Sequence, residues 1–198
     1  MGAATAGTPD PYAPAMLRGG AREAVTVAVL GPHPRGAVEA GRPGTMRTSG
    51  PAPARALPPL AKAVHAALHR PAGMGQLLER RGVRTALAAM RADLVAAGLL
   101  RAALPGRTRA GRRTLKDART RHPLPSGPDG RPPVGGAGLS DEEKLIPAAL
   151  YGERALRLTA PRFARAAGLK GRGGTTERDL RQGWGGGGGS GGFGCGTV

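Results

Sequence analysis

The stretch that decides the fold covers residues 57–104 and reads LPPLAKAVHAALHRPAGMGQLLERRGVRTALAAMRADLVAAGLLRAAL. Its large apolar residues recur at the spacing of an α-helix. A first stripe contains Leu60, Val64 and Leu68, at i, i+4 and i+8. Two further stripes follow along the chain: Met74, Leu77 and Leu78, and then Val83, Leu87, Met90 and Leu94. The pattern predicts three helices that share one small core.

The ends of these helices have their own signals. Pro58 and Pro59 suit the first turn of a helix, where a missing N–H costs nothing. Arg70 stands before a proline, which disfavours helix there. Gly82 is expected to separate the second helix from the third, and Gly98 to cap the third in a left-handed conformation. We therefore expect residues 57–104 to form a small three-helix, winged-helix-like unit.

Composition limits how much of the remaining chain folds. The 198 residues include 35 Gly and 19 Pro, while Leu, Ile, Val and Phe number only 33. Such proportions are typical of chains with extensive disorder. The fold class is expected to be mostly α. Around residues 57–104 we expect a disordered start (1–14), a short helix (15–30), a linker (31–56), a basic segment with a Pro/Gly linker (105–139), a short helical piece (140–169) and a flexible Gly-rich tail (170–198).

The charge is strongly one-sided. Thirty Lys and Arg against thirteen Asp and Glu give a formal net charge of +17. An excess of this size favours polyanionic partners, either nucleic acid or an anionic membrane surface. The alternative is codon bias, because a GC-rich genome raises Ala, Gly, Pro and Arg together. The single cysteine, Cys195, excludes an internal disulfide, and no signal peptide or membrane span is visible, so we expect a cytoplasmic chain.

A basic run between residues 101 and 121 is the first candidate binding segment. It contains eight basic residues and one acidic residue, Asp117. Basic side chains close to an anionic bilayer gain up to about 1 kcal/mol each. The alternative is a charged segment that is merely solvated. The predicted anionic-surface residues are Arg107, Arg109, Arg112, Arg113, Lys116, Arg119 and Arg121.

A second candidate lies in the three-helix unit, where the second and third helices have the order of a helix-turn-helix. In that arrangement the third helix would present Arg84, Thr85 and Arg91 to a DNA groove. The alternative is that the three helices only pack together, with a basic face that is solvated and binds no partner. No aromatic residues stand between the arginines, which argues against a stacking platform for single strands.

The sequence contains only weak patterns for metal binding or catalysis. His65 and His69 have the i, i+4 spacing of two metal ligands, but no third ligand is obvious and a zinc site needs three or four. Cys195 has no partner histidine, and no catalytic triad or carboxylate pair stands out. We therefore expect no metal, no cofactor, no catalytic residue and no enzyme activity.

Four short pieces, in order, resemble a family of uncharacterised membrane proteins of high-GC, actinobacterial-type bacteria. These proteins have a Leu-Arg-Gly-Gly element and a glycine/cysteine-rich C-terminal tail. The matching pieces are MLRGG at 16–20, a helical unit at 59–100 ending in LVAAGLL, RTRAGRRTL at 107–115 with its continuation to 123, and AALYG at 148–152. The resemblance covers about two thirds of the chain.

Two departures from that family affect the expected function. The family has a transmembrane segment between the second and third pieces, where this chain has only residues 101–106. Its repeated tail cysteines are here reduced to Cys195. The resemblance implies a membrane-associated, non-enzymatic role without an anchor, peripheral at the inner face of the membrane. A DNA-binding helix-turn-helix-like module is the alternative, and a degenerate gene product without function is the third reading.

Overall fold

The computed structural model describes residues 10–50, 57–103, 106–124 and 141–169. In these ranges the chain is mostly helical, which confirms the expected fold class. None of the helices found there is long and apolar enough to cross a membrane. In chain order the elements are α1 Tyr12–Gly19, α2 Ala21–Leu30, η1 His33–Arg35, β1 Val38–Ala40, β2 Met46–Thr48, α3 Pro59–Ala67, α4 Met74–Glu79, α5 Arg81–Ala96, α6 Arg109–Arg121, α7 Asp141–Tyr151, α8 Glu153–Thr159 and α9 Pro161–Ala166.

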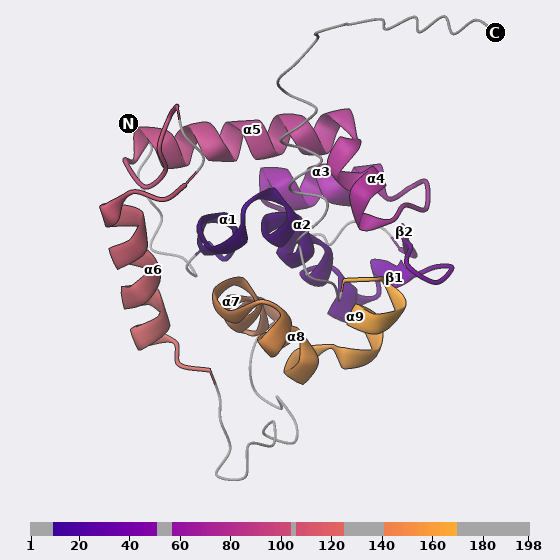
Figure 1. The fold of residues 1–198 in the computed structure, drawn as a ribbon. Helices are drawn as coiled ribbons and strands as arrows, with labels where there is room; N and C mark the ends of the chain where they lie inside the picture. The colour runs from indigo at the N-terminus through magenta and orange to yellow at the C-terminus, as the bar shows by residue number, and fades with distance from the viewer. Residues whose placement is uncertain (1–9, 51–56, 104–105, 125–140, 170–198) are drawn as a thin grey trace, which may run out of the picture.

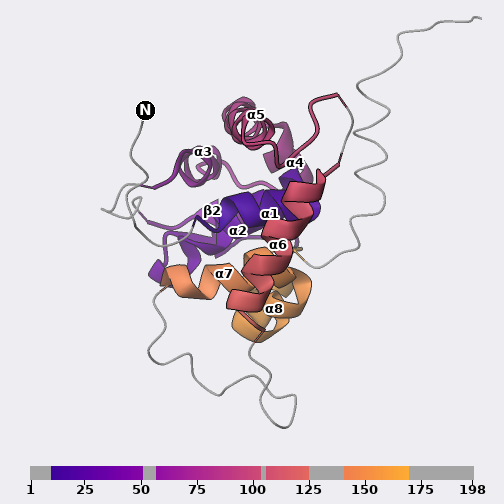
Figure 2. The same ribbon diagram turned by 90° about the vertical axis from the view of Figure 1, so that its left-hand side faces the viewer.

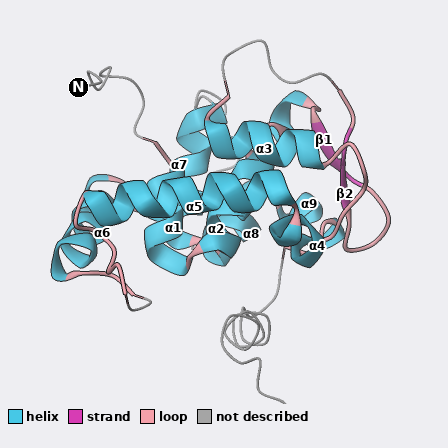
Figure 3. Cartoon of the chain, turned by 90° about the horizontal axis from the view of Figure 1, so that it is seen from above, coloured by secondary structure: helices cyan, strands magenta, loops and turns pink. Residues whose placement is uncertain are grey.

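Figure 1 shows the arrangement of these elements. The α1–α2 pair lies in the middle, with α3, α4 and α5 on one side and α7, α8 and α9 on the other. The long helix α5 lies along one outer side of the molecule. Figures 1 and 3 both place α6 at one end of the molecule and the β1–β2 hairpin at the other end.

The central pair α1 and α2 differs from the single helix that the sequence predicts over residues 15–30. Gly20 has φ of 74° and turns the chain between the two helices, a backbone conformation that favours glycine. Residues 12–14, expected to be disordered, begin α1, whereas residues 1–9 lie outside the described part. Seven consecutive buried residues, 24–30, leave α2 without an exposed face. The three valines of α2 are therefore all buried.

The expected linker over residues 31–56 is wrong for residues 31–50. Val38 to Ala40 pairs antiparallel with Met46 to Thr48, and both Val38 and Met46 are fully buried. The glycines of this stretch make its turns, since Gly36 and Gly44 have φ of 68° and 80°. The Gly44 N–H donates to the Ala166 carbonyl at 2.8 Å, which attaches the hairpin to α9. Residues 51–56 lie outside the described part.

The three helices predicted within residues 57–104 are present as α3, α4 and α5. Gly98 has φ of 68°, and the Leu99 N–H donates to the Leu94 carbonyl, which is the predicted C-terminal cap. Two details differ. The break between α4 and α5 falls at Arg80, and Gly82 lies inside the first turn of α5. The three helices also do not form a separate core of their own, because α3 packs against both α5 and the buried α2.

The basic segment that begins at residue 105 forms a helix over part of its length. Within residues 105–121 Leu115 is the one large apolar residue, which is too little for a helix to stand alone. α6 forms because its buried residues, Gly111 and Leu115, lie against neighbouring helices. It contacts α1 and α7. Residues 125–139, expected as a Pro/Gly linker, lie outside the described part.

The predicted helical piece at residues 140–169 contains three helices, α7, α8 and α9. Gly152, with φ of 59°, separates α7 from α8, and Gly168, with φ of 66°, follows α9. Phe163 of α9 stacks on the ring of His33, with the ring centroids 3.7 Å apart. The expected flexible tail, residues 170–198, lies outside the described part.

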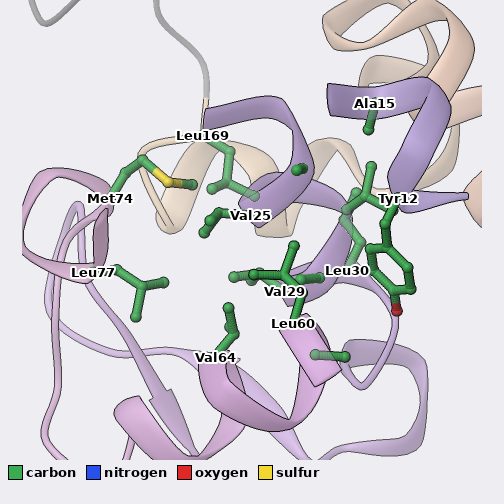
Figure 4. Close-up of a cluster of buried hydrophobic side chains, with 14 of the residues drawn as sticks. Tyr12, Ala15, Val25, Val29, Leu30, Leu60, Val64, Met74, Leu77 and Leu169 are labelled. Carbon is green, nitrogen blue, oxygen red and sulfur yellow. The ribbon is translucent and has the colours of Figure 1, made fainter. Parts of the chain in front are cut away.

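One apolar cluster joins nearly all of these elements. It extends from Tyr12 in α1 to Leu169 after α9 and includes α2, the hairpin, α3, α4, α5, α7 and α8. Figure 4 shows Val25 and Val29 of α2 among Leu60 and Val64 of α3 in this cluster. Apolar burial of this kind is the main stabilising term in folding. Residues from 12–46 and 145–169 thus share one core with residues 60–100.

A second type of contact joins α1 to α7. The Arg18 Nε donates to the Ala149 carbonyl at 2.9 Å, and its Nη2 forms an ion pair with Glu23. Gly152 lies against the same guanidinium, so that a Cβ at that position would collide with it. The side chains of Arg18 and Glu23 are only 17% and 27% exposed. The hydrogen bond from Arg18 to Ala149 therefore joins residues that are 131 positions apart in the chain.

Replacing Arg18 tests this junction. Arg18→Gln should lower the free energy of unfolding by about 3 kcal/mol, because it leaves Glu23 half-buried without its partner. The control Arg47→Gln removes an exposed pair with Glu39 and should change the same quantity by less than about 0.5 kcal/mol. Chemical denaturation measures both values. Equal, small losses in the two variants would contradict the assigned role of Arg18.

Candidate anionic-surface site

The basic helix α6 begins at a capped N-terminus that lies on the end of α5. The Thr108 Oγ1 accepts a hydrogen bond from the Gly111 N–H at 3.0 Å, which satisfies one free donor of the first turn. The same hydroxyl donates to the Gly98 carbonyl at 2.7 Å. The Thr108 N–H donates to the Leu99 carbonyl at 3.0 Å. These bonds fix the start of α6 relative to α5.

Gly111 brings α6 unusually close to the end of α5. A Cβ at this position would collide with the Leu99 carbonyl and would lie 3.5 Å from the Leu17 side chain of α1. Glycine inside a helix costs about 1 kcal/mol relative to alanine. The close approach to Leu99 explains why a glycine is needed here despite that cost.

The second half of α6 is attached to α7. Leu115 packs with Ile146 and Leu150 in a small apolar cluster of its own. The Arg119 Nε and Nη2 both donate to the Leu150 carbonyl, at 3.2 and 3.1 Å. The Tyr151 hydroxyl donates to the His122 carbonyl at 3.0 Å, just beyond the last turn of α6. α6 is thus attached at its beginning, its middle and its end.

The structure divides the seven predicted anionic-surface residues into two groups. The Arg119 guanidinium binds the Leu150 carbonyl, Arg121 donates to the Asp117 carbonyl at 3.4 Å, and Arg107 is half-buried in a backbone bridge with Leu100. The other four are exposed and make neither a hydrogen bond nor an ion pair through their side chains within the described residues: Arg109, Arg112, Arg113 and Lys116.

These four residues, called the α6 stripe below, lie on one face of the helix. Their positions are i, i+3, i+4 and i+7, a spacing that puts neighbouring Cβ atoms about 5–6 Å apart. Like charges at this spacing destabilise a helix by about 0.2–0.5 kcal/mol per pair. Asp117 is the one acidic residue of α6. The stripe is therefore a concentrated, self-repelling positive charge on a helix that its other contacts hold in place.

The exposed face of α6 has no large apolar side chain. The large apolar residue of the helix, Leu115, is buried against α7, and no aromatic residue occurs in the helix. Figure 2 shows α6 in front of α1 and α7, so that its outer side faces away from the rest of the molecule. Binding through this face would therefore be electrostatic, because the helix has no free apolar side to insert into a bilayer.

The predicted DNA-reading residues lie on α5. Arg84 and Thr85 are exposed near its start. Arg91 is half-buried, and its Nη2 donates to the Arg101 carbonyl at 3.1 Å. Only two of the three predicted residues are thus available to a ligand. Ala88 and Ala92, which are exposed one and two turns after Arg84, have no hydrogen-bonding side chain.

The histidine pair of α3 has an uneven environment. His65 is 7% exposed, and its Nε2 is buried without a hydrogen-bond partner, whereas His69 is exposed. Their ring centroids are 6.3 Å apart. Among the residues that the structure describes, no group of three or more His, Cys, Asp or Glu side chains could hold a metal ion. Cys195 lies outside the described residues.

Two residues that place the α6 stripe were missed by sequence reasoning. Gly111 and Tyr151 occur in the sequence analysis only within the quoted pieces RTRAGRRTL and AALYG, without a structural role. One signal was available: Gly111, Leu115, Ala118 and His122 recur at i, i+4, i+7 and i+11, which is the spacing of a buried helical face. The abundance of arginine over the same stretch obscured it.

Comparisons with protein-family models, curated proteins and solved structures find nothing that matches this chain.

Two glycines that lie inside helices offer a matched test of whether α6 packs against Leu99. Gly111→Ala should lower the free energy of unfolding by about 1–3 kcal/mol, because its Cβ meets the Leu99 carbonyl. Gly82→Ala in α5 should raise it by up to about 1 kcal/mol, since Gly82 has open space around it and alanine is the better helix former. Chemical denaturation of both variants measures the difference. Stabilisation by both substitutions would show that α6 does not pack on Leu99.

Proposed function

We propose that this chain is a non-enzymatic interaction protein that attaches reversibly to the inner, anionic face of a membrane through the α6 stripe. The observation on which this rests is the set of four exposed cations on one face of an attached helix, which have no side-chain partner within the described part of the chain. A patch of one charge sign attracts and concentrates the opposite charge. Anionic head groups would also relieve the repulsion within the stripe.

The expected binding strength is modest. Four basic residues at about 1 kcal/mol each give about 4 kcal/mol, which corresponds to a dissociation constant on the order of 1 mM. The overall charge of +17 adds a weaker, longer-ranged attraction. At physiological ionic strength such interactions are screened beyond about 8 Å. We therefore expect attachment that salt reverses, rather than stable insertion.

A lipid surface is preferred to nucleic acid as the partner for two reasons. The four-piece resemblance described above is to membrane proteins, and the third piece of that resemblance contains the entire α6 stripe. α6 also lacks aromatic residues on which single-stranded bases could stack. The single cysteine, which excludes an internal disulfide, supports the cytoplasmic side.

Duplex nucleic acid is the second candidate partner, through α5. The observation that favours it is the exposure of Arg81, Arg84 and Thr85 in the first two turns of that helix. The first turns of a recognition helix are the part that reaches base edges in a helix-turn-helix protein. This partner would use a different helix from the α6 stripe, so variants can separate the two.

Charge removal from the stripe tests the membrane proposal. The wild-type chain should sediment with vesicles that contain acidic phospholipid at low salt and stay in the supernatant at about 0.5 M salt. The variant R109Q/R112Q/R113Q/K116Q should reduce the sedimented fraction at least about fivefold, because it removes the cations closest to the surface.

A matched control exists elsewhere on the molecule. The variant K62Q/R70Q/R162Q/R165Q removes the same number of Lys and Arg charges from exposed positions on α3, its following turn and α9, and should sediment almost like the wild type. Equal losses in the two variants would contradict a specific role of α6. Salt-sensitive duplex binding that Arg84→Ala weakens, together with indifference to vesicles, would favour the second candidate instead.

A further inference from the structure

Given the attachment proposed above, on which this inference rests, we infer that the α6 stripe is specific for phosphate groups that are linked in pairs or chains. It would bind lipid head groups with two or more phosphates more tightly than a diffuse layer of single negative charges. The stripe would thus have chemical selectivity as well as electrostatic attraction. Three properties of α6 support this: its rigidity, its choice of cation and the spacing of its side chains.

The rigidity comes from the attachments at the beginning, middle and end of α6. The Thr108 cap and the close approach of Gly111 fix the first turn, and Leu115 fixes the middle. The hydrogen bonds of Arg119 and Tyr151 fix the end. Diffuse attraction to a fluid surface does not require fixed positions of the charges. A preorganised set of donors gains affinity when the ligand has a matching, fixed geometry.

The choice of cation favours direct contact with oxyanions such as the phosphates of a lipid surface. Three of the four stripe residues are arginine: Arg109, Arg112 and Arg113. The planar guanidinium donates two parallel hydrogen bonds to the oxygens of one phosphate, whereas the lysine ammonium acts as a point charge. Lysine and arginine attract a distant negative charge almost equally. The abundance of arginine therefore matters only where the ligand is contacted directly.

The spacing favours linked phosphates. Arg109 has both Arg112 and Arg113 as neighbours, and each of those also neighbours Lys116, with about 5–6 Å between Cβ atoms. The four side chains thus form a closed group in which two cations can flank each of two adjacent phosphates. A second phosphate held by a covalent link reaches the group without a further loss of translational freedom. A single phosphate would engage only half of it.

The position of the stripe favours a lipid source. All four side chains are exposed on the outer side of a helix, so a ligand is contacted from one side only. A layer of head groups presents its phosphates from one side in the same way. The stripe and the linked phosphates of such a layer are therefore complementary in both charge and shape.

A charge-conserving variant separates selectivity from simple attraction. R109K/R112K/R113K keeps the net charge but removes the paired hydrogen bonds of arginine, and R70K/R162K/R165K is its control on exposed sites elsewhere. Each full-length chain is titrated with tripolyphosphate and with inorganic phosphate by calorimetry. Each is also sedimented with vesicles of a two-phosphate lipid (cardiolipin) and of a one-phosphate lipid (phosphatidylglycerol), matched in total lipid phosphate.

The wild type and the control should bind tripolyphosphate about tenfold more tightly than inorganic phosphate, and should prefer the two-phosphate vesicles. The α6 lysine variant should lose both preferences and still sediment with phosphatidylglycerol. Retention of both preferences by that variant, or no preference in the wild type, would overturn the selectivity. Tripolyphosphate selectivity without any vesicle binding would overturn the lipid source. Vesicle binding that survives R109Q/R112Q/R113Q/K116Q would instead refute the underlying attachment.

Discussion

The guanidinium of Arg18 is the contact on which the arrangement of the outer helices depends. It joins Glu23 of α2 to the Ala149 carbonyl of α7, and it lies against Gly152, where any side chain would collide with it. The preceding residue, Leu17, faces Gly111 of α6. Two consecutive residues of α1 thereby contact both α6 and the end of α7. Residues 17–20 thus form a junction between helices.

The position of α6 follows from this junction. Burial of α2 provides an apolar centre, α1 lies on it, and α7 and α6 then pack against α1. The apolar side of α6 is small, so the helix depends on polar bonds at both ends and on the glycine that admits the Leu99 carbonyl. What remains on its outer side is four cations. The same features that hold the helix in place therefore present its charge to the outside.

Sequence patterns predicted the elements with the clearest local signals. Leu60 and Val64, at helical spacing, predicted α3, and Gly98 predicted the end of α5. The four cations were within the predicted basic run, but nothing local distinguished them from Arg119, whose guanidinium binds a carbonyl 31 residues away. Likewise, the bond from Arg18 to Ala149 and the burial of Val38 and Met46 depend on contacts between distant segments. Proline and glycine in residues 31–50 resembled a linker because the same residues also make tight turns.

The most direct test of this account is amide hydrogen exchange of the intact chain, compared between α6 and α5. If α6 is a fixed helix, the amides of residues 113–120 should exchange at least about 100-fold more slowly than an unstructured peptide, because they open only with a cost in free energy. They should fall within the range shown by α5, which packs on the main core. Exchange of the α6 amides at the rate of an unstructured peptide, beside a protected α5, would contradict the account, because the four cations would then have no fixed positions.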